Sequence, residues 1–318
     1  MKDTSDFLLE LAEAGDLGSW RIALEDIAEE RGYYDALGAE HAALFAEGGE
    51  VLLVSFEEEA AARARANHAP LGWTLAQARG WSSLVLLSRG QTWFRDPHVY
   101  AYFDRLVDDG FFDEFTSVIF LGAGDGGYAA AAFSVAAPGA TLIALAPQAT
   151  LSPERAGWDK RFPEARRLDF TSRYGYAAAM AEAALHAFVI HDPAIAEDAM
   201  HAQLFESRGI QPVRARHFGA SLAAVLEQTG ALGAMLDAAA AGRLDSAAIY
   251  RALRARRDSV AWLRNLLADV SAGGDPHKVV RLCRHVIDSH GGTRPFPKAL
   301  SRARRDISRA AAQDKTDT

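Results

Sequence analysis

Short apolar runs, separated by amphipathic or alanine-rich stretches, constrain the fold of this chain more than any other feature. The runs are too short for helices and show little polar alternation, which is typical of strands buried on both faces of a parallel sheet. The stretches between them are long enough for helices that cross from one parallel strand to the next. The sequence therefore predicts an α/β fold with a mostly parallel sheet of about six strands, at residues 51–56, 83–87, 118–121, 141–145, 187–190 and 213–215.

The parts of the chain before and after this alternation are predicted to be helical. Residues 5–48 place Phe7, Leu11, Trp20 and Ile27 at helical spacing, and the apolar pattern continues from Tyr33 to Phe45. No strand candidate follows residue 219. We expect N-terminal helices over 1–48, an α/β core over 49–218 and a helical, basic C-terminal subdomain over 219–318.

Charge is distributed unevenly along the chain. The net charge is −8, but residues 1–240 contain 18 Lys and Arg against 34 Asp and Glu, whereas residues 241–318 contain 16 against 8. Opposite charges of this kind favour docking within the chain or between subunits. The basic segment has few aromatic residues and no nucleic-acid-binding module. We therefore expect a small-molecule ligand or a protein partner, including a homo-oligomer through the C-terminal helices, and no nucleic acid.

Composition excludes several classes of protein. A chain that is 49% hydrophobic and 24% charged is typical of globular proteins and not of disordered ones. Cys283 is the single cysteine, so it can form no internal disulfide and no zinc or iron–sulfur site. No apolar run approaches the roughly 20 residues of a membrane helix, and the first residues lack the features of a signal peptide. We expect a cytoplasmic protein with no membrane segment, no metal and no cofactor.

The most informative motif is a glycine-rich turn within residues 118–130, VIFLGAGDGGYAA. The pattern predicts a strand, a sharp turn and a helix, because glycine permits tight bends and close backbone approach. The first amides of the helix can bind an anion, and α/β folds place their sites at the carboxyl ends of strands. We therefore expect a ligand to contact Gly122, Gly124, Gly126 and Gly127, together with Arg95 and Gln148, which follow neighbouring predicted strands.

The turn resembles the nucleophile elbow, Gly-x-Ser-x-Gly-Gly, of the α/β-hydrolase superfamily, and the similarity covers roughly Val51 to Leu226. The resemblance implies an α/β-hydrolase-like sheet with the nucleophile at Gly124, the acid at Asp192 and the histidine at His217. Glycine has no oxygen with which to form an acyl-enzyme. The resemblance thus implies a hydrolase-like protein that has lost serine catalysis and binds a ligand or partner.

Two other interpretations of the turn remain open. Asp125, one residue further on, could act as a nucleophile or base in an active enzyme, with His217 in the same role as an alternative; capping of the helix is the simpler role for Asp125. The string also resembles motif I of S-adenosylmethionine-dependent methyltransferases, which implies a binder of S-adenosylmethionine or a nucleotide. In that family two acidic residues hold the ligand, and Phe120 and Ala146 stand in their places.

The whole chain further resembles bacterial proteins labelled phosphoadenosine phosphosulfate reductase. That activity would require a Ser-Gly-Gly-Lys-Asp-type phosphate loop and a Glu-Cys-Gly-Leu-His motif, and the sequence contains neither. Cys283 lies in a predicted helix, where we expect it to be packed. The residues therefore do not support this chemistry.

Two further segments carry polar residues that could belong to a site. His191 and Asp192 end a predicted strand, and Asp198 and His201 lie three apart on the next helix. We expect turn formation and surface pairing there, because metal-ligand spacing is missing. The long loop over 148–173 has the length of a lid or binding loop.

Overall fold

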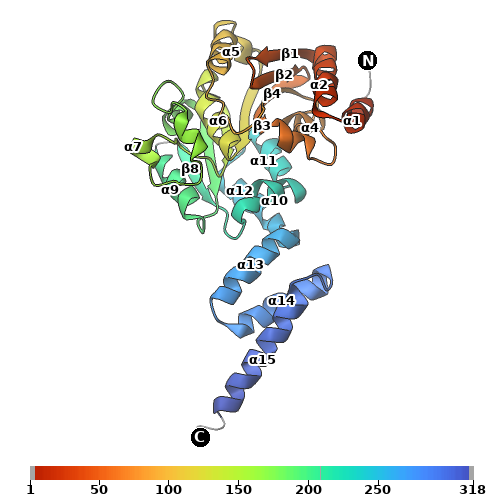
Figure 1. Cartoon of the computed structure of the whole chain (residues 1–318), viewed down its shortest axis with the longest axis vertical. Helices are drawn as coiled ribbons and strands as arrows, with labels where there is room; N and C mark the ends of the chain where they lie inside the picture. The colour runs from red at the N-terminus through yellow and green to blue at the C-terminus, as the bar shows by residue number, and fades with distance from the viewer. Residues whose placement is uncertain (1–3, 208, 315–318) are drawn as a thin grey trace. The chain divides into compact units, whose positions relative to one another are not determined.

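The computed structural model describes residues 4–207 and 209–314. It shows an α/β fold built on one eight-stranded sheet, in the order β1-β2-β4-β3-β5-β6-β7-β8 (Figure 1). β2 runs antiparallel to both of its neighbours, and every pairing from β4 to β8 is parallel. The strands are β1 (Gly32–Leu37), β2 (His41–Ala46), β3 (Gly49–Glu58), β4 (Trp81–Ser88), β5 (Ser117–Ala123), β6 (Thr141–Leu145), β7 (His186–His191) and β8 (Ile210–Arg214).

The sheet has two more strands than the sequence predicts, and the prediction of helix over residues 33–45 is wrong. These residues form the β1–β2 hairpin, whose turn begins at Gly38 with φ +69°. β2 lies between β1 and β4, and its residues His41 to Leu44 are all buried. A strand buried on both faces shows no alternation of polar and apolar residues, so its sequence cannot be distinguished from part of a buried helix.

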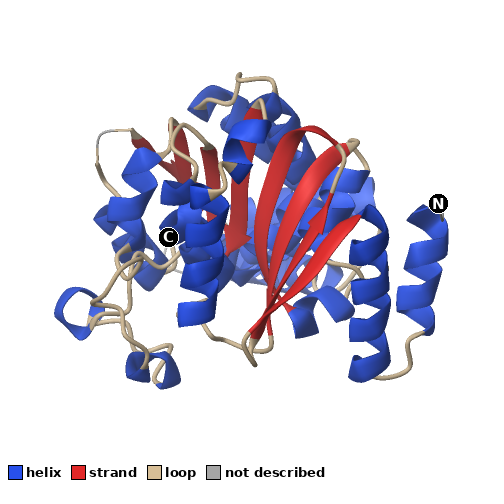
Figure 2. Ribbon diagram, turned by 90° about the horizontal axis from the view of Figure 1, so that it is seen from above, coloured by secondary structure: helices blue, strands red, loops and turns tan. Residues whose placement is uncertain are grey.

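Helices cover both faces of the sheet (Figure 2). Successive side chains of a strand point to opposite faces: Val85 and Leu87 of β4 pack with the first four helices, whereas Leu84 and Leu86 pack with α5, α6 and α8. These helices are α1 (Thr4–Glu13), α2 (Leu17–Arg31), α3 (Glu59–Arg63), α4 (Leu71–Gln77), α5 (Pro97–Asp108), α6 (Asp125–Phe133), α7 (Pro153–Ala156), α8 (Ala177–Met180) and α9 (Ala196–Leu204).

The chain divides into two compact units. The first contains the sheet and comprises the described residues up to Arg214 together with Gly233–Ile249; the second comprises Ala215–Leu232 and the described residues from Tyr250 onward. No helix in the described part of the chain is long and apolar enough to cross a membrane. The remaining helices are α10 (Leu222–Gln228), α11 (Ala231–Ala240), α12 (Ser246–Ala252), α13 (Val260–Ala272), α14 (Pro276–His290) and α15 (Phe296–Asp314).

Candidate functional site

The topology of the sheet identifies where a ligand would bind. From β3 the chain moves to β4 on one side and then returns to the other side of β3 to form β5. Open α/β sheets bind ligands outside the carboxyl ends of the strands where the order reverses in this way. Here that place lies between the ends of β3 and β5, where Phe56 pairs with Gly122. We call the carboxyl ends of β3 to β7 the carboxyl edge.

The glycine turn lies at this reversal point and forms a sharp bend between β5 and α6. Gly124, at the apex, has φ 58° and ψ −121°, a conformation in which a residue with a side chain is strained. Its amide donates to the carbonyl of Leu145 at 2.9 Å, and its carbonyl accepts from the amide of Tyr128 at 2.9 Å. A nucleophile elbow holds its serine on a strained strand-to-helix turn of this kind. In this chain the apex residue has no side chain.

The glycines on either side of the apex are required for close packing, whereas the apex itself is open. A Cβ atom on Gly122 would lie 2.0 Å from the carbonyl oxygen of Gly126, and one on Gly126 would lie 2.3 Å from that of Phe56. A Cβ atom on Gly124 would have no heavy atom within 4 Å. Space therefore permits a side chain at the apex, and only the backbone conformation opposes it.

Asp125 follows the apex as the first residue of α6 and is partly buried. Its Oδ1 accepts from the amide of Gly126 at 2.9 Å. Burial raises the pKa of Asp125 to about 6; the hydrogen bond from Gly126 opposes this shift, and the charge of Glu58 adds to it. Glu58 was not predicted from sequence, because its place beside the glycine turn depends on the pairing of β3 with β5. The result is a carboxyl group that can hold a proton near neutral pH.

The predicted acid and histidine lie in different units. Asp192 directly follows β7 in the first unit, is buried, and accepts from the amide of Ala194 at 3.0 Å. His217 belongs to the second unit, where its Nδ1 lies 2.5 Å from Oδ2 of Asp269 on α13. This histidine–carboxylate pair was not predicted from sequence. The partnership of Asp192 and His217 in catalysis stays a prediction.

Arg95 holds the long loop in place. Its guanidinium donates to the carbonyls of Asp169 at 2.8 Å and Arg173 at 2.7 Å, and to Oγ of Ser172 at 3.1 Å. Three contacts from one planar group fix the end of the loop against the segment between β4 and α5. The contacts give Arg95 a structural role, and its predicted role in ligand binding stays a prediction.

The same loop is anchored by an ionic cluster in which Asp159, Asp198 and His201 are buried and Arg161 reaches solvent. His201 is fully buried; its Nδ1 accepts from the amide of Ala149, so Nε2 carries the proton and donates to Asp159 at 3.0 Å. Burial lowers the pKa of His201 to about 4, which keeps the ring neutral at physiological pH. Asp198 and His201 are therefore interior residues, and the prediction of surface pairing on this helix is wrong.

Arg161 supplies the positive charge of the cluster. Its guanidinium donates to Asp159 at 2.8 Å and to Asp198 at 2.6 Å. Burial by itself would raise the pKa of Asp159, but the hydrogen bonds from Arg161 and His201 outweigh it and hold that pKa below its usual value. Within the described ranges, no three or more His, Cys, Asp or Glu side chains are placed so that they could hold a metal ion. The cluster is thus satisfied internally, and it fixes the loop over the ends of β6 and β7.

At the ends of β6 and β7, two buried polar atoms have no hydrogen-bond partner among the described residues. They are Oε1 of Gln148, just after β6, and Nδ1 of His191, at the end of β7. Both side chains are at least nine-tenths buried. Gln148 was predicted from sequence as a binding residue, whereas His191 was assigned a structural role at the turn.

Comparisons with known proteins provide no family for this chain. No protein-family model matches it, and neither does any curated protein. Among solved structures it is similar to a chain of the Glycosylation Associate Protein (Gap123) complex from Streptococcus agalactiae, at 15% identity and a TM-score of 0.41. That match covers 66% of this chain and 47% of the other, so the chain spans about half the length of its relative.

Two further solved structures are similar over most of their own length. The capsule O-acetyltransferase of Neisseria meningitidis serogroup A is 12% identical, with a TM-score of 0.37 and coverage of 61% of this chain and 90% of that one. MPT51 (FbpC1) of Mycobacterium tuberculosis is 14% identical, with a TM-score of 0.37 and coverage of 64% and 94%. At these identities and scores, no activity or residue role is carried over to this chain.

Proposed function

We propose that this chain is an α/β-hydrolase-like protein that performs no serine-dependent acyl transfer and binds a small polar ligand at the carboxyl edge. The apex of the elbow carries the proposal: Gly124 has the strained bend of a nucleophile position but no side chain. The strand order, with β2 antiparallel and the glycine turn after β5, supports an α/β-hydrolase-like sheet. Without an oxygen at position 124, no acyl-enzyme can form there.

The polar character of the ligand follows from the unsatisfied atoms at the edge. Oε1 of Gln148 is an acceptor, and Nδ1 of His191 can donate or accept according to its tautomer. Leaving such atoms buried without a partner costs about 1–3 kcal/mol each. A ligand that donates a hydrogen bond to Gln148 would recover this free energy. The amides at the start of α6 would bind a carbonyl or anionic group of the same ligand.

A second candidate function is supported by Asp125. Its pKa of about 6 is near the value that suits a general acid or base at neutral pH. Asp125 would then act on a bound ligand in place of the missing serine. An S-adenosylmethionine or nucleotide binder has less support, because the antiparallel pairs are β1–β2 and β2–β4, whereas β8, at the other edge of the sheet, pairs in parallel with β7. Methyltransferase sheets have an antiparallel strand at the edge that β8 occupies here.

A fluorophosphonate probe tests the loss of serine chemistry. We expect no labelling of the unmodified protein, and labelling of any of its serines would refute the proposal. Gly124→Ser places a hydroxyl at the apex, next to the amides of α6, and should gain labelling. Ala123→Ser is the matched control, because it adds the same group one residue earlier at an exposed position. Equal labelling of the two variants would show that Gly124 is not the apex of an elbow.

A thermal-shift screen tests ligand binding. Short acyl esters, nucleotides and S-adenosylmethionine are compared for the increase in melting temperature that they produce. We expect the effective ligand to lose its shift in Gln148→Leu but to keep it in Gln203→Leu, which removes an exposed amide from α9. A shift by S-adenosylmethionine that does not depend on Gln148 would favour the methyltransferase-like interpretation.

A further inference from the structure

Helix α15 of the second unit carries a regular stripe of positive charge. Lys298, Arg302, Arg305 and Arg309 are spaced four, three and four residues apart, so they lie on one face of the helix. All four are exposed. At a rise of about 1.5 Å per residue the stripe is about 16 Å long. We call these four residues the cation stripe.

The direction of the stripe is set by the opposite face of the helix. Phe296 and Ala303 are buried, and Leu300 and Ile307 are partly buried. This apolar face packs along α14, the neighbouring helix of the hairpin. Because residues of an α-helix repeat every 3.6 positions, burial of this face directs the cation stripe to solvent.

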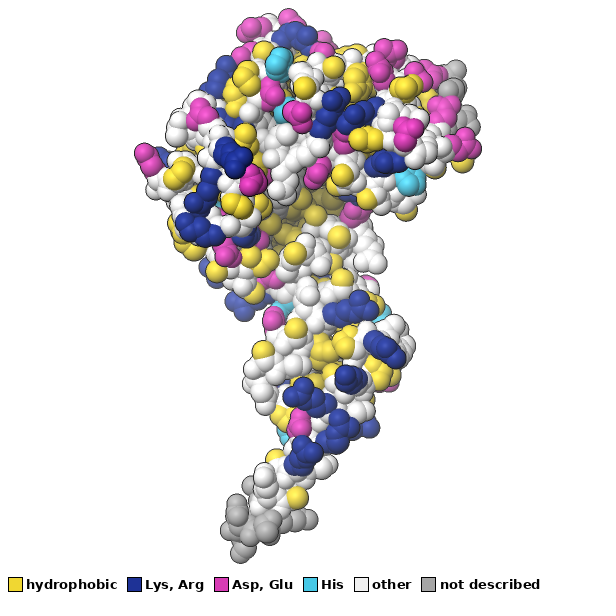
Figure 3. All heavy atoms as spheres, viewed as in Figure 1, with side chains coloured by type: hydrophobic (Ala, Val, Ile, Leu, Met, Phe, Trp, Pro, Cys, Tyr) yellow, Lys and Arg dark blue, Asp and Glu magenta, His cyan; other side chains and the backbone are white. Residues whose placement is uncertain are grey.

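The stripe is not neutralised within the described part of the second unit. None of its four cations makes a hydrogen bond or an ion pair with another described residue, whereas Arg21, Arg79, Arg105, Arg161 and Arg173 of the first unit all pair with carboxylates. Arg281 and Arg284 on α14 are also exposed and make no ion pair with a described residue. Lys and Arg side chains accordingly gather over these helices (Figure 3).

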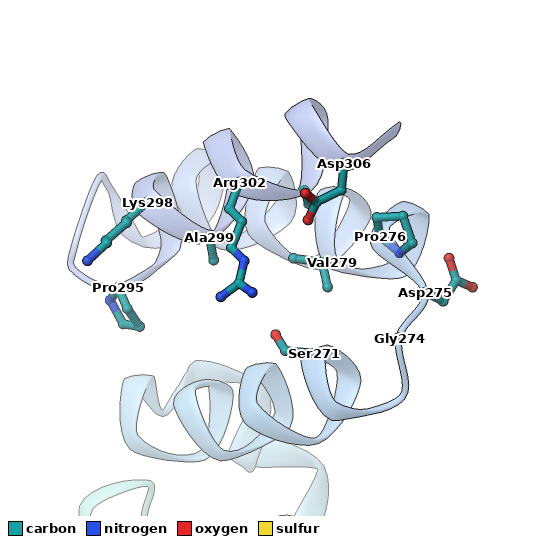
Figure 4. A pocket seen from close by; sticks show the side chains of 11 residues that line it. Ser271, Gly274, Asp275, Pro276, Val279, Pro295, Lys298, Ala299, Arg302 and Asp306 are labelled. Atoms are coloured by element: carbon teal, nitrogen blue, oxygen red, sulfur yellow. The ribbon is translucent and has the colours of Figure 1, made fainter. Parts of the chain in front are cut away.

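A groove of about 520 Å³ borders the stripe. It lies between the end of α13, the start of α14 and α15, and Lys298 and Arg302 contribute to both the groove and the stripe. In the close-up view Arg302 extends from α15 into the space above Ser271 of α13 (Figure 4). Val279 and Ala299 provide apolar lining. Asp275 and Asp306 also line the groove, so it combines a hydroxyl, two cations and two carboxylates. The unbalanced positive charge therefore lies along the cation stripe and not in the groove.

We propose that the α14–α15 hairpin binds the phosphate backbone of nucleic acid through the cation stripe. A row of unpaired cations about 5–6 Å apart is complementary to a polyanion, and binding gains free energy by releasing counterions from it. This differs from the sequence-based expectation of no nucleic acid. Composition shows the lack of aromatic residues for base stacking, but it does not show that the cations align on one face. We therefore infer backbone contacts without base recognition.

The surface favours nucleic acid over a lipid membrane. Amphipathic helices that lie on membranes insert large apolar residues beside their cations. The exposed large hydrophobic residues of the described chain are Leu9, Leu17, Ile22, Val107, Leu185, Met200 and Tyr250, and none of them is on α13, α14 or α15. The apolar residues of α15 face the hairpin and are not available to lipid.

Binding of the full chain to a fluorescein-labelled DNA duplex tests the proposal by anisotropy over a salt series. Four phosphate contacts predict a slope of about −3.6 in a plot of log K against log salt concentration. Arg305→Gln should reduce the magnitude of the slope by about 1. Arg304→Gln removes the same charge from the adjacent residue, which lies about 100° around the helix, and should leave the slope unchanged.

Three outcomes would overturn the proposal. The first is an absence of binding at low salt, or binding that salt does not weaken. The second is an equal loss of slope in Arg304→Gln and Arg305→Gln, which would show diffuse attraction and no stripe. The third is binding to phosphatidylserine vesicles, or salt-sensitive dimerisation in light scattering, in the absence of DNA binding. Circular dichroism of each variant confirms that the helices are retained.

Discussion

Replacing Asp125 with asparagine tests the electrostatics of the candidate site. Burial raises the pKa of Asp125 from its ordinary value of 3.8 to about 6 in the folded protein. A carboxyl group with a raised pKa binds its proton more tightly when the chain is folded. Its stabilising contribution is therefore fully present below about pH 3.8 and is lost as the pH rises through about 6. Asparagine keeps the shape of the side chain but does not titrate.

The size of the effect follows from the shift. About two pKa units correspond to about 3 kcal/mol, at 1.36 kcal/mol per unit. Asp125 is only partly buried, so solvent screening reduces this figure, and we expect about 1–3 kcal/mol. Between about pH 4 and pH 8, the free energy of unfolding of Asp125→Asn should rise by this amount relative to that of the unmodified protein.

Urea unfolding followed by circular dichroism, repeated over this pH range, measures the difference. Asp108→Asn is the matched control, because Asp108 is exposed near the end of α5 and makes no hydrogen bond with a described residue. We expect its effect on the free energy of unfolding to be small. If Asp125→Asn is destabilising by an amount that grows with pH, attraction between the carboxylate and the start of α6 outweighs burial, and the reasoning is refuted.

Two further predictions concern the packing around the site. Gly122→Ala should lower the free energy of unfolding by more than about 3 kcal/mol, because its Cβ meets the backbone of α6. Gly124→Ala should lower it by only about 1–3 kcal/mol, the cost of the strained backbone. Equal losses in urea unfolding would contradict the geometry of the turn. Arg161→Gln leaves Asp159 and Asp198 without their cation, so it should lower the free energy of unfolding by about 2–3 kcal/mol and speed proteolysis of the loop over 148–173. An unchanged cleavage rate would show that the cluster does not hold the loop.

The local sequence was sufficient to predict structure where a residue's conformation depends on its immediate neighbours in the chain. The strand and helix that flank the glycine turn follow from apolar runs and from Gly122 to Gly127, and the start of α5 follows from Asp96 and Pro97. At Asp96 the side chain accepts from the amide of His98, as an N-cap residue does. These features involve residues only a few positions apart, so a single segment contains all the information.

The sequence by itself determined the alternation of strands and helices, and with it the position of the glycine turn that joins β5 to α6. Only the tertiary structure decided that residues 32–37 and 41–46 are strands, that Glu58 lies beside Asp125, that Arg161 joins Asp159 to Asp198, and that the second unit exposes a row of cations on α15. The physical reason is that burial and pairing depend on which segments meet. Strand order and helix packing bring together residues that are far apart in the chain, and no local pattern of apolar or charged residues records those contacts.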